Sequence, residues 1–300
     1  MNLLGLYNVL VALLFCPLLL SVINRTKACF AGRAGQPWLQ PYRDIGKLLC
    51  KGAVYSRTTS WVFRAGPMVG LAAALAACVL VPLGANGAPL SFSGDLILLA
   101  YLLGLMRFFT VIAALDTGSA FEGMGASREV FFSALAEPAF LLGLTALAHA
   151  AGTFSLSELT GAGSRVWARP ESVLVIAAFF VTFLCENARI PFDDPNTHLE
   201  LTMIHEVMVL DHGGVDFAYV LYGAALKLWL LGAVLVSVVL PVRSAIAWVN
   251  IGSGLLGMAL LGVVVGIVES TMARFRLLRV PYLLVGASVL SVLAVILGLR

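Results

Sequence analysis

The chain has 300 residues, a net charge of +3 and a mean hydropathy of +0.98, with 60% hydrophobic and only 12% charged residues. This composition excludes an ordinary soluble globular domain and indicates an integral membrane protein. The small net charge gives no reason to expect a nucleic-acid partner.

Blocks of about 20 apolar residues, each long enough to cross about 30 Å of hydrocarbon, predict an all-α fold with eight transmembrane helices. They are residues 3–23, 67–86, 95–115, 130–151, 172–187, 217–240, 245–268 and 281–299. The first block has no basic leading segment and is too long for a signal peptide, so we expect it to be retained. No soluble domain or internal repeat is visible, and residues 1–300 are expected to form a single membrane domain.

Basic residues are concentrated on one side of these predicted helices. The first, third, fifth and seventh connections contain Arg25, Lys27, Arg33, Arg43, Lys47, Lys51, Arg57, Arg64, Arg128, Arg189, Arg274, Arg276 and Arg279, and the other side has Arg165, Arg169, Arg243 and Arg300. By the positive-inside rule, both termini are expected outside a bacterial or archaeal inner membrane.

The first connection, residues 24–66, contains a candidate amphipathic helix that begins at Pro41 and stops at Gly52. Tyr42, Ile45, Leu48 and Leu49 lie on one face, and Arg43, Lys47 and Lys51 lie on the other. We expect this helix to lie on the cytoplasmic membrane surface. A basic segment that only fixes the topology is the alternative.

Four ionisable residues interrupt the apolar blocks: Arg107, Glu137, Glu186 and Lys227. Arg107 and Glu137 lie about 12 to 14 Å from the same side of two consecutive, antiparallel helices, the depth that pairing requires. Charges inside a membrane usually serve ion or proton movement, although a static pair that fixes helix packing is the alternative. Burial tends to raise the pKa of a carboxylic acid, so proton exchange at Glu137 and Glu186 is a hypothesis.

Residues 186–216 form the most acidic connection of the chain. Pro191 and Pro195 predict a turn after the fifth block. The spacing of apolar residues from Thr197 to Leu210 then predicts an amphipathic helix that stops at Gly213 and Gly214. This loop is expected on the cytoplasmic side.

No metal site is predicted in this chain. His198, His205 and His212 are seven residues apart, so on one helix they are about 10 Å apart and cannot share a metal ion. They are either surface histidines or proton donors. Asp193 and Asp194 suggest magnesium, but no second aspartate-rich cluster accompanies them. The five cysteines form no CxxC pair, which places any iron–sulfur cluster on a partner.

Two motifs carry a family resemblance. The pattern E-N-x-R-x-P-F-D, at residues 186–193, followed by Glu200 and Leu201, resembles the signature of the NADH dehydrogenase subunit 1 family of complex I. The sequence GASRE at residues 125–129, with Glu137 and Pro138, resembles the hydrogenase branch of that family, which includes the membrane subunit of formate hydrogenlyase and related energy-converting hydrogenases.

The resemblance implies a subunit that anchors a soluble electron-transfer arm and couples redox chemistry to proton movement. Its carboxylates are expected at Glu137, Glu186, Asp193 and Glu200. Asn196 and His198 replace two carboxylates of the complex I pattern, so quinone binding stays open. The expected partners are soluble subunits with iron–sulfur clusters, which in the hydrogenase branch include a nickel–iron centre, antiporter-like membrane subunits and the lipid bilayer.

Two groups of candidate site residues follow. For proton transfer or coupling they are Glu137, Glu186, Asp193, Asp194, Glu200, Glu206, Arg107, Lys227 and Asp116. For docking they are Arg43, Asp44, Lys47, Arg128, Glu129 and Arg189.

Three functions are compatible with the sequence. The first is a membrane subunit of a hydrogenase or formate hydrogenlyase. The second is a quinone-binding, complex I-like subunit, which predicts a long lipid-accessible cavity lined by the first, fifth and sixth helices. The third is an independent transporter. The chain shows no nucleotide-binding loop, cluster ligands or nucleophile–base pair, so we expect a subunit and not a free-standing enzyme.

Overall fold

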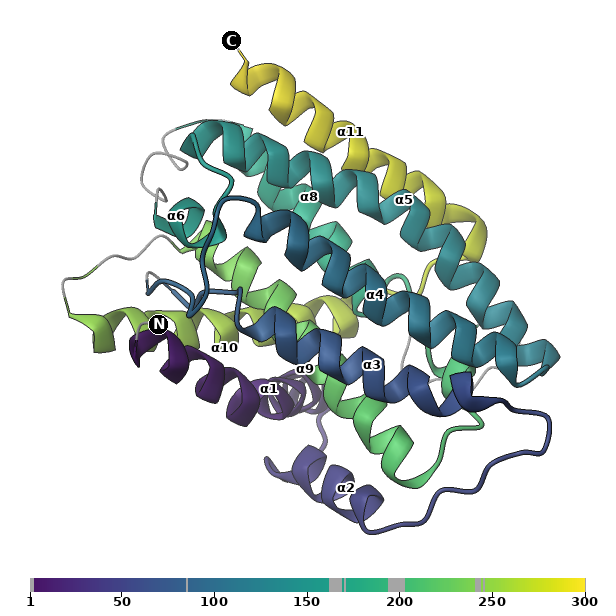
Figure 1. Cartoon of the computed structure of the whole chain (residues 1–300). Coiled ribbons are helices and arrows are strands. Elements are labelled where there is room, and N and C mark those ends of the chain that lie inside the picture. The colour runs from purple at the N-terminus through teal and green to yellow at the C-terminus, as the bar shows by residue number, and fades with distance from the viewer. Residues whose placement is uncertain are drawn as a thin grey trace.

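The computed structural model describes residues 3–84, 86–161, 169, 171–193, 203–240, 244 and 246–299. Within these residues the fold is helical, as predicted (Figure 1). The α-helices are α1 (Leu3–Phe30), α2 (Gln40–Leu49), α3 (Trp61–Cys78), α4 (Asp95–Asp116), α5 (Ala120–Ala151), α6 (Leu156–Gly161), α8 (Glu171–Glu186), α9 (Gly214–Val239), α10 (Ala247–Thr271) and α11 (Val280–Gly298). Two short 3-10 helices are η1 (Glu206–Val209) and η2 (Leu277–Arg279).

Seven helices of the described chain are long and apolar enough to cross a membrane: α1, α3, α4, α5, α9, α10 and η2 continued by α11. The chain is therefore a multi-pass membrane protein. The expected count of eight is not confirmed, because α8 forms at the fifth predicted position with only 16 residues. A helix of that length rises about 24 Å, which is short of the hydrocarbon thickness.

Several predicted boundaries were wrong, and for α1 and α5 the cause is that polar residues ended the apolar window before the helix ends. α5 begins at Ala120 and not at residue 130, so the GASRE segment is helical. α1 continues to Phe30, which places Arg25 and Lys27 inside it. α3 runs from Trp61 to Cys78, earlier than its predicted window of 67–86.

α9 is the central helix of the bundle. Leu226, Leu228 and Leu230 are each less than 2% exposed, so side chains on every face of α9 are covered. Such all-round burial explains why α9 lacks an amphipathic pattern. α1, α2, α3, α8 and α10 contact it, and α5, α8 and α11 pack on one another (Figure 1).

α2 lies beside the bundle, at the end opposite α6 and both chain termini (Figure 1). The Tyr42 hydroxyl donates a hydrogen bond to the carbonyl oxygen of Leu14 in α1. Ser21 Oγ donates to the Trp38 carbonyl at 2.7 Å. No residue of α2 is fully buried. The helix thus forms where the sequence predicts it, and its location on a membrane surface stays a prediction.

The predicted helix from Thr197 to Leu210 was wrong in its described part. Residues 194–202 lie outside the described chain, Met203 to His205 are not helical, and only η1 follows. Gly213 and Gly214 do not end a helix, because Gly213 precedes α9 and Gly214 is its first residue. A Cβ on Gly214 would lie 2.6 Å from the Gly52 carbonyl oxygen, so this glycine lets the chain after α2 approach α9 closely.

Candidate functional site

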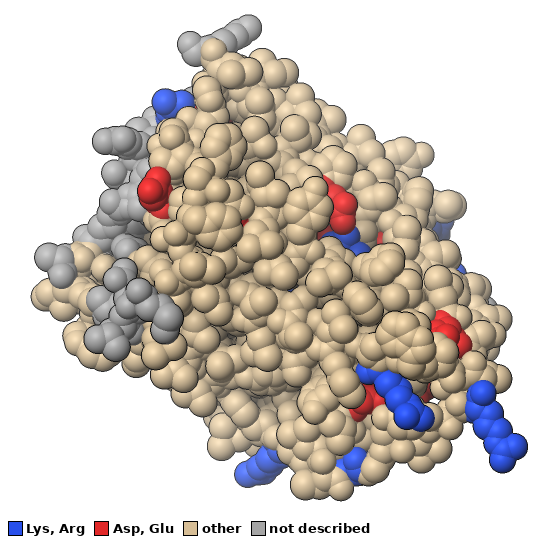
Figure 2. All heavy atoms as spheres, viewed as in Figure 1, with Lys and Arg blue, Asp and Glu red and all other residues tan. Residues whose placement is uncertain are grey.

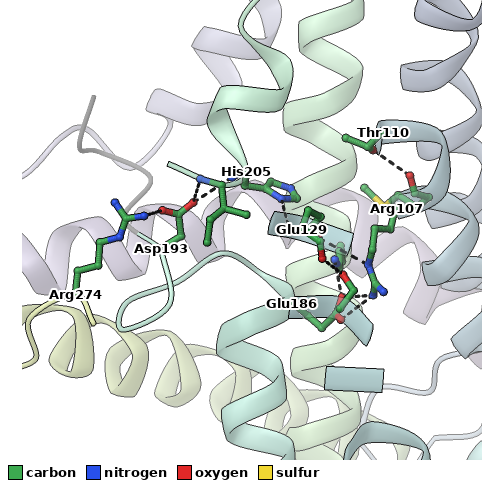
Figure 3. Close-up of polar contacts among 11 residues, drawn as sticks. Arg107, Thr110, Glu129, Glu186, Asp193, His205 and Arg274 are labelled. Carbon is green, nitrogen blue, oxygen red and sulfur yellow. Dashed lines mark hydrogen bonds and ion pairs between the residues drawn. The ribbon is translucent and has the colours of Figure 1, made fainter. Parts of the chain in front are cut away.

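Arg107 of α4 lies at the centre of a group of charged side chains between α4, α5, α8 and α9 (Figure 3). Its Nη1 donates to Glu137 Oε1 at 2.5 Å, and its Nη2 lies 2.7 Å from both carboxylate oxygens of Glu186. Glu129 Oε1 is 3.8 Å from Arg107 Nε. The Arg107 side chain is only 10% exposed, so these contacts form largely away from solvent.

Two further side chains complete this group. Lys227 Nζ of α9 lies 2.9 Å from Glu186 Oε2, and His205 Nδ1 lies 3.7 Å from Glu129 Oε2. We call the six residues Arg107, Glu129, Glu137, Glu186, His205 and Lys227 the Arg107 cluster.

The formal charge of the Arg107 cluster is not balanced. Its three carboxylates contribute −3, and the guanidinium and ammonium groups contribute +2, which leaves −1 when the histidine is neutral. Buried charges are costly unless they are paired. One further positive charge would neutralise the cluster.

A second charged group, the Glu269 network, fixes the chain after α8. The fully buried Glu269 side chain of α10 lies 2.8 Å from Lys27 Nζ of α1 and 3.3 Å from Arg189 Nη1. Glu269 is absent from the predicted site because the seventh apolar window ends one residue before it. A single carboxylate at the end of a long apolar block was the available signal, as it was for Glu186.

Asp193 connects the segment that follows α10 to the Arg107 cluster. Its Oδ1 lies 2.8 Å from Arg274 Nη2, and its Oδ2 accepts hydrogen bonds from the backbone N–H groups of Ile204 at 3.0 Å and His205 at 3.1 Å. Figure 3 shows Asp193 between Arg274 and the segment that carries His205. Asp193 therefore holds the backbone of His205, the residue whose ring faces Glu129.

A cavity of about 560 Å³ reaches the Arg107 cluster. Its lining includes Leu20 and Asn24 of α1, Asp44 and Ile45 of α2, Glu186 of α8, and Val220 and Lys227 of α9. Arg107, Glu129 and His205 also line it. Residues of the first, fifth and sixth predicted helices thus contribute to its lining, and its wall combines apolar and charged groups. Whether lipid reaches the cavity, as the quinone-binding alternative also requires, stays a prediction.

Two of the remaining predicted site residues hold backbone segments outside the Arg107 cluster. Asp116 accepts hydrogen bonds from the N–H and Oγ of Ser60, at 2.7 and 2.8 Å, and thereby holds the start of α3. Arg128 Nη1 donates to the Met203 carbonyl at 3.0 Å.

The other predicted positions do not form a single group. Arg43 and Lys47 are exposed on α2, Asp44 and Glu206 line the cavity, and Arg189 is buried in the Glu269 network; Asp194, His198 and Glu200 lie outside the described residues.

His212 faces aromatic and not ionic neighbours. Its ring stacks on Phe63 at a centroid distance of 3.9 Å and an angle of 15°. Burial lowers the pKa of His212, partly opposed by the nearby Asp216 and Asp211 carboxylates. His205 and His212 therefore sit in different environments, and within the described residues no group of three or more His, Cys, Asp or Glu is arranged to hold a metal ion.

The segment that carries His205 packs closely on the first half of α5. A Cβ on Gly125 would lie 2.3 Å from Val207 Cγ1 and 2.9 Å from the Ile204 carbonyl oxygen, so only glycine fits there. We expect Gly125→Ala to lower the free energy of unfolding by about 1–3 kcal/mol through overpacking.

Gly123→Ala is the matched control for this prediction, because a Cβ there meets no atom within 4 Å. Chemical unfolding in detergent compares the two variants. Equal stabilities would contradict the close packing of η1 on α5.

The comparisons with known proteins identify the family. The family model described as NADH dehydrogenase matches residues 4–299. The chain belongs to this NADH dehydrogenase family, as the resemblance to the complex I subunit predicted.

One relative is formate hydrogenlyase subunit 4 of Escherichia coli (strain K12). It is 34% identical to this chain over 288 residues, and the match covers 91% of this chain and 90% of the relative. Hydrogenase-4 component C of the same organism is 31% identical over 285 residues, covering 93% and 90%. NADH-ubiquinone oxidoreductase chain 1 of Mycosarcoma maydis is 27% identical over 226 residues, covering 73% and 67%. The chain is thus a complex I-like membrane subunit with greater similarity to these hydrogenase components than to this quinone-linked relative.

The fold has a solved counterpart. A chain in the structure of the membrane-bound sulfane sulfur reductase, an archaeal respiratory membrane complex, superposes with a TM-score of 0.86 at 20% identity. The match covers 99% of this chain and 98% of that chain. At this identity the likeness concerns the fold alone.

Proposed function

We propose that the chain is the membrane-anchor and energy-coupling subunit of a multisubunit oxidoreductase of the formate hydrogenlyase or membrane-bound hydrogenase kind. The observation that carries this proposal is the Arg107 cluster, which is one proton short of neutrality inside a membrane bundle. Redox work in a docked soluble arm drives uptake of that missing proton by the cluster, and the proton then leaves through a neighbouring membrane subunit. The relatives named as hydrogenase components support this branch of the family.

The partners and the orientation follow from the same proposal. The end of the bundle that carries α2 and η1 faces the cytoplasm of a bacterial or archaeal cell, and both termini face outward, as the distribution of basic residues favours. The soluble subunits that bind this end carry the iron–sulfur clusters and the hydrogen-forming metal centre. The chain itself supplies the cavity and the charged groups that take up and release the proton.

A quinone is the second candidate ligand, and the cavity is the observation that favours it. Its position between α1, α8 and α9 and its mixed apolar and charged lining fit a quinone head group. When bound, a quinone supplies two-electron redox chemistry, and Glu129, His205 and Lys227 are the cavity-lining residues of this chain able to hold or donate its protons.

The test begins with the tagged complex, isolated in mild detergent, its partners identified, and its hydrogen evolution and quinone reduction measured. Glu186→Gln and Glu137→Gln are then compared in proteoliposomes with the exposed control Glu158→Gln of α6. We expect each cluster variant to lower coupled proton movement about 100-fold, and the control to leave it unchanged. Normal coupling in both cluster variants, or a chain isolated without partners, would refute the proposal, and quinone reduction without hydrogen evolution would establish the second candidate.

A further inference from the structure

Glu137 differs from the rest of the Arg107 cluster because it faces outward. Its side chain is 53% exposed, whereas those of Arg107 and Glu186 are 10% and 11% exposed. Its Oε1 atom binds Arg107, and the described chain provides no hydrogen-bond partner for its other carboxylate oxygen. In Figure 2, acidic and basic atoms emerge together from a mostly uncharged part of the surface over the middle of α4 and α5.

This carboxylate lies near the middle of a long membrane helix. Glu137 is 17 residues from the start and 14 residues from the end of α5, which is about 26 and 21 Å along the axis. The neighbouring exposed positions are apolar, namely Ala134, Pro138 and Leu141 of α5 and Leu105 and Phe108 of α4. If lipid covered this face, a carboxylate would point into hydrocarbon, where charged groups are rare and costly.

We propose that a transmembrane helix of another membrane subunit covers the α4/α5 face and presents a basic side chain to Glu137. The sign of the partner's charge follows from Glu137 itself, because its second carboxylate oxygen is exposed, has no hydrogen-bond partner within the described chain and is complemented by a cation. α4 also provides room for close approach, because a Cβ on Gly104 would meet no atom within 4 Å. Small residues let membrane helices pack closely. The inference rests on the proposed function in that this partner belongs to the same complex.

Photocross-linking in the assembled complex tests this inference. Benzoylphenylalanine replaces Ala134, one turn from Glu137 on the exposed side of α5, and the complex is irradiated in native membranes. We expect an adduct with a transmembrane helix of a different subunit that carries Lys, Arg or His within one turn of the attachment point. Adducts with lipid alone, with a second copy of this chain, or with a helix that lacks a basic residue would overturn the proposal.

Charge exchange gives an independent readout. We expect Glu137→Lys to lower the adduct yield about tenfold through like-charge repulsion, and the reciprocal change of the partner's basic residue to Glu to restore it. Failure of that second change to restore the adduct contradicts a basic partner. Coupled proton movement in Glu186→Gln and Glu137→Gln reports on the proposed function separately. Normal coupling in both variants together with the expected adduct defeats the proposed function and leaves the interface standing.

Discussion

Arg107→Met is expected to lower the free energy of unfolding by about 3–5 kcal/mol, the usual cost of removing one partner from a buried ion pair. The change leaves Glu129, Glu137 and Glu186 with Lys227 as their only fixed cation in the cluster. Methionine retains most of the volume of the arginine stem, so the loss reports mainly on charge. Chemical unfolding of the detergent-solubilised chain measures it.

Two further variants make this experiment specific. Arg43→Met is the matched control, because Arg43 is exposed on α2 and has no acidic partner within the described chain, and we expect a change within about 0.5 kcal/mol. In the double variant Arg107→Met/Glu186→Met, one uncompensated carboxylate is removed and part of the lost stability should return. If Arg107→Met and Arg43→Met unfold alike, the cluster is not a cooperative unit.

The sequence predicted the charged residues of the cluster better than their contacts. Arg107, Glu137, Glu186 and Lys227 are evident because each interrupts an apolar block, and the helical rise gives the depth of each. Helix neighbours do not follow from depth, so the two-oxygen contact of Glu186 with Arg107 and its ion pair with Lys227 emerge only from the structure. Glu129 was assigned to a docking loop because the apolar window of α5 begins at residue 130.

The incorrect helix prediction after Thr197 has a tertiary cause. The apolar spacing that predicted a helix also suits residues that pack on α5, since Val207 and Ile204 contact the surface at Gly125. Asp193 captures the N–H groups of Ile204 and His205, which removes them from any helical hydrogen-bond pattern. Contacts distant in sequence therefore override the local periodicity.

Glu269→Gln is expected to have an effect of similar size, about 3–5 kcal/mol of unfolding free energy, because the change leaves Arg189 buried with no carboxylate in the Glu269 network. Lys27 is 23% exposed and can recover partial hydration, so most of the cost arises at Arg189. Glu158→Gln, in an exposed position, is the matched control.

The consequence of Glu269→Gln should extend beyond stability. Arg189 lies four residues before Asp193, and Asp193 holds the backbone of His205. If Arg189 loses its fixed position, we expect Asp193 to release the segment that carries His205, whose ring faces Glu129. We expect faster amide hydrogen exchange in residues 187–193 and 203–209, and unchanged exchange in α11. Faster exchange confined to α10 would mean that Glu269 stabilises helix packing alone, and the Arg107 cluster would then be positioned independently of α10.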